Sequence, residues 1–314
     1  TTHADGTTHT CEFEHGQYLN RGAWRIPGQH HSTLYYARSL GVPLEVMINY
    51  SSQSYIYSED IEGPLKGKRV RRIHARADRL GNVAELLAKC AMGGALDDKM
   101  NKEDVEKLLD YLKGTGLINR ETFEYQANSI RGYSSYPGAG ENYGKLSEPY
   151  PFSDLLKLNM EMGELTSDHP AVMFQAVGGM DQIAFALRDA LPRGSIKLNQ
   201  EVTKIAQSDD GVTIRYKDTK SGREQTAKAD YCISTIPFAV ITEIDNDFSP
   251  AMIDAMKTPD PRHVAKFGLQ MKTRFWETDD MIYGGNSSTS MAASIAYPAA
   301  DMHGANGGVL LASY

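Results

Sequence analysis

The spacing of apolar residues changes along the chain, and this change most constrains the fold. Between residues 75 and 165 apolar residues recur at three- and four-residue spacing, as at Leu80, Val83, Leu87 and Cys90. This spacing predicts amphipathic helices that bury one face. On either side of the stretch, apolar and polar residues alternate as they do in strands. The sequence therefore predicts a mixed α/β protein that contains a helical subdomain.

The remaining elements follow from periodicity and from turn residues. Gly41 is placed to close a short helix at its C-terminal end. A loop is expected at 133–140, where Ser, Tyr, Pro and Gly cluster. Helices are predicted at 34–40 and 180–191, and strands at 53–57, 196–198, 202–205, 212–216, 229–237, 263–272 and 308–314.

Composition excludes several classes of protein. The chain has 314 residues, enough for about two domains, and its 33 Lys and Arg are outnumbered by 40 Asp and Glu. Scattered net negative charge does not form a nucleic-acid surface, and no apolar run approaches the roughly 20 residues of a membrane-spanning helix. The three cysteines lie far apart and predict neither a disulfide scaffold nor a metal site.

The sequence lacks the short motifs that identify common catalytic sites. There is no GxGxxG, P-loop, HExxH or GxSxG pattern. Two glycosylation sequons begin at Asn49 and Asn286, a number that chance alone would supply. The chain begins at Thr1 without Met and stops in an apolar run that ends at Tyr314. We expect it to be a piece of a longer protein.

Six consecutive residues, Gly-Ala-Trp-Arg-Ile-Pro at 22–27, resemble the G-x-M-R-[IFL]-P segment of flavin-dependent L-amino acid oxidases, in the flavin amine oxidase superfamily. Further stretches resemble the family in the same order along the chain. These are 178–181 with 190–191, 201–205, 229–237, Lys266 with 275–277, and 308–314. Trp24 departs from the family, which usually has Met there. The family's N-terminal GxGxxG segment and its C-terminal flavin-contacting segment fall outside this chain.

The resemblance implies an α/β fold of mixed α+β type. It would comprise an FAD-binding Rossmann-like domain of the amine oxidase type, a mixed-sheet substrate domain and an inserted helical domain. By this match, 1–65 is the first part of the substrate-binding domain and contains the flavin-contacting turn 22–25. Residues 66–172 form the helical domain, 173–260 the middle portion of the FAD-binding domain, and 261–314 the second part of the substrate-binding domain.

The resemblance also assigns substrate-binding residues. Arg25 matches the residue that binds the substrate α-carboxylate, and a guanidinium suits this role because its planar fork can donate two parallel hydrogen bonds. The alternative is a surface arginine before a proline turn. Tyr314 matches a phenol that binds the same carboxylate, with Tyr283 and Tyr297 as competitors and a core tyrosine as the alternative. Residues 160–162 and His169 lie in the stretch that supplies the family's substrate pocket.

Lys266 matches a catalytic lysine that holds a water near flavin N5. The alternating pattern of 264–271 is also that of a solvated lysine on the polar face of a strand. For FAD, the implied contacts are Gly22, Ala23, Trp24, Arg25 and Val202. A glycine at position 22 would allow close approach of the backbone to a cofactor, and a simple turn is the alternative. No metal is implied.

The implied activity is oxidative deamination of an L-amino acid by FAD, which gives a 2-oxo acid, ammonia and hydrogen peroxide. The alternatives within the superfamily are an amide-forming amino-acid 2-monooxygenase and an amine oxidase. A non-catalytic binding protein on the same scaffold is the alternative of a different class. The expected partners are the amino acid and O2, with no nucleic acid and no membrane. We expect a homo-oligomer, and the remaining segments of the same protein are a further candidate partner. The compartment stays open.

Overall fold

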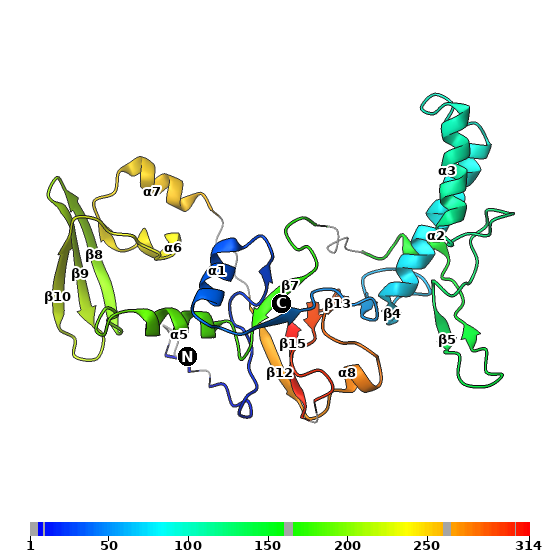
Figure 1. Ribbon diagram of the computed structural model, residues 1–314. Coiled ribbons are helices and arrows are strands. Elements are labelled where there is room, and N and C mark those ends of the chain that lie inside the picture. Colours follow the sequence, from blue (N-terminus) through cyan, green and yellow to red (C-terminus); the bar gives the residue numbers. More distant parts are fainter. Residues whose placement is uncertain (1–5, 9, 160–165, 260–264, 305) are drawn as a thin grey trace. The chain divides into compact units, whose positions relative to one another are not determined.

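The computed structural model describes residues 6–8, 10–159, 166–259, 265–304 and 306–314 (Figure 1). The protein is of the mixed α/β class, as the spacing of its apolar residues predicts. It divides into two units, one formed by Thr1–Ala186 with Ala265–Tyr314 and the other by Leu187–Val264. The first unit therefore draws on both halves of the sequence.

The main sheet of the first unit has six strands in the order β12-β15-β14-β13-β3-β4. The strands are β3 (Tyr55–Tyr57), β4 (Val70–Arg71), β12 (Phe267–Met271), β13 (Asn286–Thr289), β14 (Ala293–Ala296) and β15 (Gly308–Ser313). Strands β13 and β3 run parallel, and the other neighbouring pairs run antiparallel. Trp276 of α8 (Phe275–Thr278) is buried together with Ile282 and Leu310. Strands β3, β12 and β15 lie within three of the predicted strands.

A second sheet in this unit has three antiparallel strands, with β7 in the centre and β1 and β2 at its sides. The strands are β1 (Ile26–Pro27), β2 (Leu44–Met47) and β7 (Met173–Ala176). Ile26 and Val46 both pair with Phe174. This register anchors the start of β1, directly after Arg25, and the end of β2, two residues before Asn49.

Helix α1 (His31–Ser39) connects these strands and ends at the predicted glycine. The N–H of Gly41 donates to the carbonyl of Arg38 over 3.2 Å, and the N–H of Val42 donates to the carbonyl of Ala37 over 2.8 Å. These two bonds define a Schellman motif, which requires the left-handed backbone that Gly41 adopts at φ +70°. Val42 and Ala37 are buried together, so the turn directs the chain back onto the small sheet.

The described part of the predicted helical stretch, up to residue 159, contains two long helices and one short one. Its elements are α2 (Arg72–Met92), α3 (Lys102–Gly114), α4 (Phe152–Leu155) and a hairpin of β5 (Tyr133–Ser135) with β6 (Lys145–Leu146). The hairpin begins where a loop was expected. Asn101 caps α3 by accepting a hydrogen bond from the N–H of Asp104 over 3.0 Å. Ala75 and Leu155 of this part are buried together with Ile56 of the main sheet.

The prediction of which face of α2 is buried is wrong. Leu80, Val83 and Cys90 are exposed, and Leu87 is only partly buried. The small residues buried on α2 are Ala75, Ala77, Gly81, Ala84, Ala88 and Ala91. A β-carbon on the glycine of this set would lie 2.0 Å from the ring of Tyr125. The small face therefore forms the core because it allows the neighbouring segment to approach the helix closely.

A buried ion pair fixes the helical part. The guanidinium of Arg131 donates from Nε to Oδ1 of Asp78 over 2.5 Å and from Nη2 to Oδ2 over 3.1 Å. The hydroxyl of Tyr125 and the N–H of Tyr150 also donate to this carboxylate. Both charges are buried, so their desolvation is offset by these hydrogen bonds.

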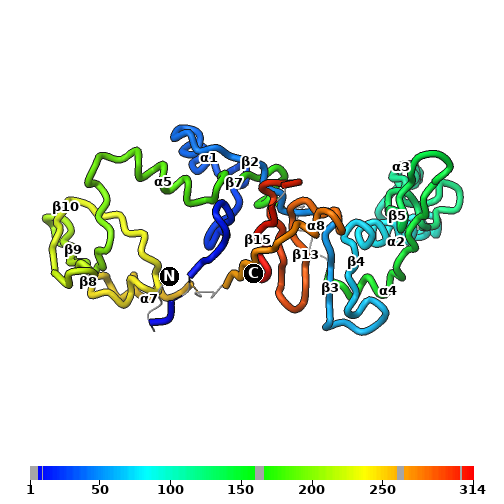
Figure 2. The backbone as a smooth tube through the Cα atoms, turned by 90° about the horizontal axis from the view of Figure 1, so that it is seen from below, coloured from blue at the N-terminus to red at the C-terminus, as the bar shows by residue number. Residues whose placement is uncertain are grey.

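The second unit is built on a four-stranded sheet in the order β10-β9-β8-β11. Its elements are β8 (Gln200–Ser208), β9 (Gly211–Asp218), β10 (Glu224–Ala229), β11 (Asp245–Asn246), α6 (Phe238–Ile241) and α7 (Pro250–Lys257). The chain reaches this unit through α5 (Asp181–Ala190), which lies within the predicted helix. Figure 2 shows β8, β9 and β10 side by side, in agreement with their antiparallel pairing.

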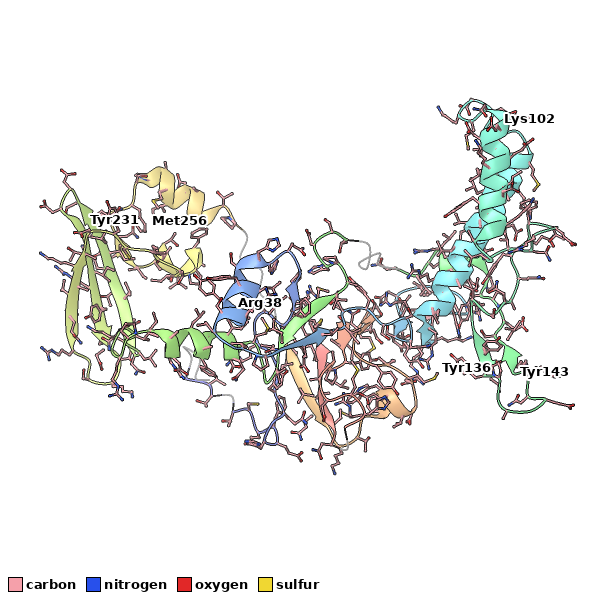
Figure 3. The ribbon with its side chains drawn as sticks, in the orientation of Figure 1. Arg38, Lys102, Tyr136, Tyr143, Tyr231 and Met256 are labelled. Atoms are coloured by element: carbon pink, nitrogen blue, oxygen red, sulfur yellow. The ribbon has the colours of Figure 1, made fainter. Side chains whose placement is uncertain are left out.

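Two predicted strands of the second unit are wrong. Strand β10 ends at Ala229, and the apolar residues after it form no strand. Tyr231, labelled in Figure 3, is 89% exposed, and Ile233 is 94% exposed. Ile196 and Leu198 are also exposed and outside any strand. Alternating apolar residues indicate a strand only where another strand pairs with them and a core covers them, and within this unit neither condition is met at these positions.

No helix among the described residues has the length and apolar character needed to cross a membrane. In the same part of the chain, no three His, Cys, Asp or Glu side chains gather in a way that could hold a metal ion. Cys11, Cys90 and Cys232 are free and exposed.

Candidate active site

Arg25 lies directly before β1 and is half-buried. Its Nη1 donates a hydrogen bond to Oδ1 of Asn49 over 2.9 Å. Among the described residues, no carboxylate forms an ion pair with this guanidinium. Its charge is therefore balanced by no acidic side chain in the part of the chain that the structure describes.

Strand pairing places Lys266 beside Tyr314. Strands β12 and β15 are antiparallel, and Phe267 lies opposite Ser313. Lys266, which precedes Phe267, therefore lies next to Tyr314, which follows Ser313. The Nζ of Lys266 lies 5.0 Å from the ring centroid of Tyr314 and 5.3 Å from that of Trp24. The Trp24 and Tyr314 rings are themselves 6.3 Å apart. Residues 24, 266 and 314, which are far apart in sequence, thus form one cluster.

The Lys266 ammonium also holds the turn that precedes Arg25. It donates hydrogen bonds to the carbonyls of Asn20, over 3.2 Å, and of Gly22. Burial lowers the pKa of Lys266, and the nearby charge of Arg25 lowers it further. The Cζ of Arg25 lies 5.8 Å from the centroid of the Trp24 ring, from which the Nζ of Lys266 is 5.3 Å away, so the two cations are neighbours of one ring.

If Lys266 were a solvated lysine, its face of β12 would be exposed and the apolar face buried. The structure shows the reverse. Phe267 is 62% exposed and Leu269 is 54% exposed, whereas Lys266, Gly268 and Gln270 are half-buried. The cause is the segment 13–20, which packs on the polar face. A β-carbon at position 268 would lie 2.9 Å from the Leu19 side chain, and the N–H of Glu14 donates to the side chain of residue 270.

The turn at Gly22 and Ala23 is open to solvent. A β-carbon at Gly22 would meet no atom within 4 Å, and the φ of Gly22 lies outside the left-handed region. This chain's own packing therefore does not require a glycine at position 22. Trp24 borders this open backbone, so a planar ring system could lie against it.

The other predicted residues make their described contacts elsewhere, although Tyr297 lines a cavity that Trp24 also lines and the charge of Arg25 acts on His169. Val202 is a half-buried residue of β8, in the second unit, where it pairs with Tyr216. Tyr297 shares a hydrogen bond with Ser287 over 2.9 Å, and the ring of Tyr283 lies 4.8 Å from that of His303. Of the pocket stretch, 160–162 lie outside the described residues. Burial lowers the pKa of His169, as does the charge of Arg25.

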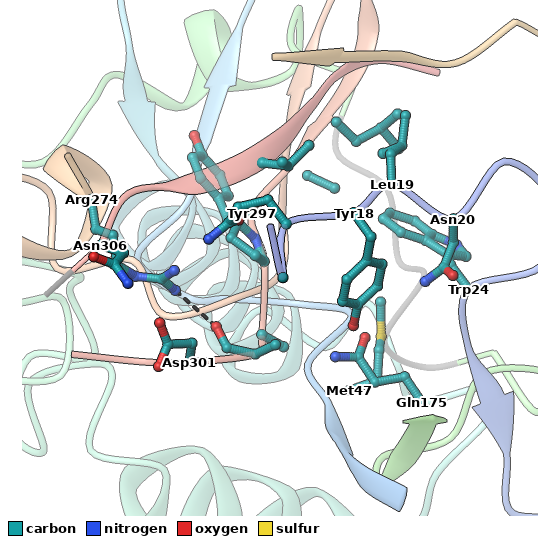
Figure 4. A pocket seen from close by; sticks show the side chains of 18 of the residues that line it. Tyr18, Leu19, Asn20, Trp24, Met47, Gln175, Arg274, Tyr297, Asp301 and Asn306 are labelled. Atoms are coloured by element: carbon teal, nitrogen blue, oxygen red, sulfur yellow. Dashed lines mark hydrogen bonds between the residues drawn. The ribbon is translucent and has the colours of Figure 1, made fainter. Parts of the chain in front are cut away.

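A cavity of about 290 Å³ adjoins Trp24 (Figure 4). Tyr18, Met47 and Gln175 gather at one side of it, and Asp301 lies at another. Burial raises the pKa of Tyr18, and the carboxylates of Glu45 and Asp181 raise it further. These lining residues were missed by sequence reasoning because they come from distant segments and carry no motif.

Asn49 was also missed, because in the sequence it is only part of a sequon. It is 6% exposed, and its carbonyl accepts a hydrogen bond from Nδ2 of Asn286 over 2.9 Å. The asparagines of the two sequons thus contact each other. The Asn49 amide is used inside the protein and is not presented to solvent.

Known proteins resemble this chain over most of its length. The family model described as flavin containing amine oxidoreductase matches residues 6–314. YobN of Bacillus subtilis, named a putative L-amino-acid oxidase, is 26% identical over 96% of this chain and 63% of its own length. The L-amino-acid oxidase of Pseudechis australis is 24% identical over 90% of this chain and 53% of its own length.

A solved structure of wild-type putrescine oxidase bound to putrescine has a TM-score of 0.50 and 15% identity, and covers 93% of this chain and 63% of that one. The chain thus spans between about half and two thirds of the length of these relatives. The match to the family model covers nearly the whole chain. The chain therefore belongs to the flavin-containing amine oxidoreductases, and its cofactor is FAD.

Proposed function

We propose that this chain is part of an FAD-dependent oxidase of an L-amino acid. The reaction converts the amino acid, O2 and water into a 2-oxo acid, ammonia and hydrogen peroxide. The observation that carries the proposal is the pair of neighbouring cations, Arg25 and Lys266. In the described residues, both are hydrogen-bonded to uncharged oxygens and neither to a carboxylate.

Two half-buried cations without an acidic partner form a site for an anion. Their mutual repulsion is relieved when a negative group lies between or beside them. An α-carboxylate fits this requirement, since its two oxygens match the guanidinium fork of Arg25. The Tyr314 ring beside Lys266 supports the proposal that its phenol donates to the same group. The site thus favours a substrate that carries a carboxylate.

The open turn at Gly22 and Ala23 supports the proposed position of FAD. Backbone from 22 to 25 would hold the flavin. For the second unit taken by itself, Val202 stays the residue proposed for the adenine end of FAD. Bound FAD supplies the acceptor for the two electrons that leave the substrate. The Lys266 ammonium has three donors, and two of them are used on carbonyls. Within the described residues no hydrogen-bond partner is seen for the third, which would then be available to a water or to the substrate.

An amine oxidase is the alternative that the structural relative suggests, since that protein was solved with putrescine. A protonated diamine would be repelled by Arg25 and Lys266, so this alternative fits the site less well. An amino-acid 2-monooxygenase would use the same carboxylate contact and differs in releasing an amide. A non-catalytic binding protein would bind carboxylates without turnover.

Peroxide production from a matched pair of substrates tests the proposal. L-Phenylalanine and 2-phenylethylamine differ by the carboxylate alone, and a panel of other L-amino acids extends the test to other side chains. We expect peroxide, ammonia and a 2-oxo acid from at least one L-amino acid and little from its amine. Equal turnover of both compounds would favour an amine oxidase, and an amide product a monooxygenase. Carboxylate binding without any turnover would favour the binding protein.

A further inference from the structure

The partner of Arg25 differs from the partners of two buried arginines in the same unit, Arg131 and Arg274. Arg131 is paired with Asp78, and Arg274 with Glu277 through contacts of 2.7 Å. Arg25 instead donates to the uncharged amide oxygen of a buried asparagine, Asn49. A neutral acceptor fixes the guanidinium without cancelling its charge, which a carboxylate would do.

We propose that Asn49 is a positioning residue that keeps Arg25 oriented and unpaired for the substrate carboxylate. By holding Nη1, the amide leaves the Nε and Nη2 edge of the guanidinium for two parallel hydrogen bonds to that carboxylate. The inference rests on the proposed function, because it takes the ligand of Arg25 to be the α-carboxylate of an amino acid. Its direct readout is carboxylate binding, which is measured independently of oxidation.

The surroundings of Asn49 keep its main chain in place. Its carbonyl accepts from Asn286, and the N–H of Gly285 donates to the carbonyl of Ile48 over 2.9 Å. A β-carbon at position 285 would lie 2.5 Å from the N atom of Ser51. The backbone on both sides of Asn49 is thus packed against the segment 285–286. The backbone of Asn49 is therefore fixed, and from this position its buried side chain offers the amide oxygen to the guanidinium of Arg25.

Two substitutions at this position separate charge from packing. Asn49→Asp keeps the size and the acceptor oxygen and adds a charge that pairs with Arg25. Asn49→Ala removes the acceptor and leaves the charge of Arg25 unpaired. Asn119→Asp is the matched control, because its Oδ1 accepts from the N–H groups of Glu121 and Thr122 in the helical part.

The test is calorimetric titration of the flavin-loaded protein that carries this chain with benzoate and with benzamide, its uncharged counterpart. We expect Asn49→Asp to weaken benzoate binding by about tenfold or more, because the added carboxylate occupies Arg25. Benzamide affinity and the melting temperature should not fall. Asn49→Ala should weaken benzoate binding less, and Asn119→Asp should change neither affinity.

A structural role predicts the opposite order, with Asn49→Ala the more harmful change and Asn49→Asp tolerated. That order, or benzoate affinity unchanged in Asn49→Asp, would overturn the inference. Kinetics with L-phenylalanine provide a second readout, in which Asn49→Asp should raise KM more than it lowers kcat. If the unsubstituted protein binds benzoate but oxidises no amino acid, the proposed function fails. The titrations of the variants still test whether Asn49 positions Arg25 for a carboxylate. If it binds neither compound, both proposals fail.

Discussion

The role of Arg25 can be tested by removing its guanidinium. In Arg25→Ala, the substrate carboxylate loses two charge-assisted hydrogen bonds, each of which contributes about 1.5–3 kcal/mol. Because these bonds share one desolvated cation, we take about 3–5 kcal/mol for the pair, which lowers kcat/KM about 10²–10⁴-fold. Lysine keeps the charge but not the planar fork, so Arg25→Lys should give an intermediate loss.

The structure also sets the expected effect on stability. In the described residues Arg25 has a single hydrogen-bond partner, so Arg25→Ala leaves one buried acceptor, Oδ1 of Asn49, without its donor. Such an unsatisfied group destabilises by about 1–3 kcal/mol. Thermal melting of the variant therefore determines how much of any activity loss comes from partial unfolding. Assays run well below the lowered melting temperature isolate the effect on binding.

The decisive assay compares L-phenylalanine with 2-phenylethylamine in both proteins, by peroxide release under steady-state conditions. Arg25→Ala should lower kcat/KM for the amino acid and leave that for the amine unchanged or higher, because a repelling cation is gone. An equal loss for both compounds would refute the reasoning, since it would mean that Arg25 supports the fold or the flavin. An unchanged value for the amino acid would refute it as well.

Three predictions concern the helical part. Asp78→Asn leaves Arg131 buried without its counter-charge and should lower the free energy of unfolding by about 3–5 kcal/mol, as measured by denaturant titration. Breaking an exposed ion pair on α3 should change that free energy by less than about 1 kcal/mol. Gly81→Ala should destabilise by about 1–3 kcal/mol, because its β-carbon would overlap the Tyr125 ring, and unchanged melting would contradict that packing. Burial and the charge of Arg131 lower the pKa of His74 from 6.5 to about 4. The unfolded state therefore takes up the proton first, so this contribution to stability is complete above pH 6.5 and is lost as the pH falls towards about 4. The decline in melting temperature over this range should be shallower in His74→Gln, and parallel declines would exclude His74 as its cause.

Local signals in the sequence predicted local structure well. Gly41 marked the end of α1 because a Schellman motif needs a left-handed residue at one fixed position. The prediction for α2 failed because periodicity shows that a helix has two faces but not which face is covered. The ring of Tyr125 comes from more than thirty residues away and packs only against a small face, so it selected the side with Gly81. Tyr231 and Ile233 alternate like a strand, but no strand of their unit pairs with them.

Some residues of the candidate site could be predicted from the sequence and others could not. Arg25, Lys266 and Tyr314 were found through resemblance to a family, and the pairing of β12 with β15 explains why the last two lie together. Asn49 had no such signal, since its side chain matters only through its contact with Arg25. A cation site for an anionic substrate must satisfy two opposing demands. The guanidinium has to be held by the protein, yet its charge has to stay available, and a neutral amide meets both where a carboxylate meets only the first. Such a residue has to leave the charge of the neighbouring guanidinium intact. No pattern in the sequence around Asn49 indicates this requirement, because it arises only from the contact with Arg25.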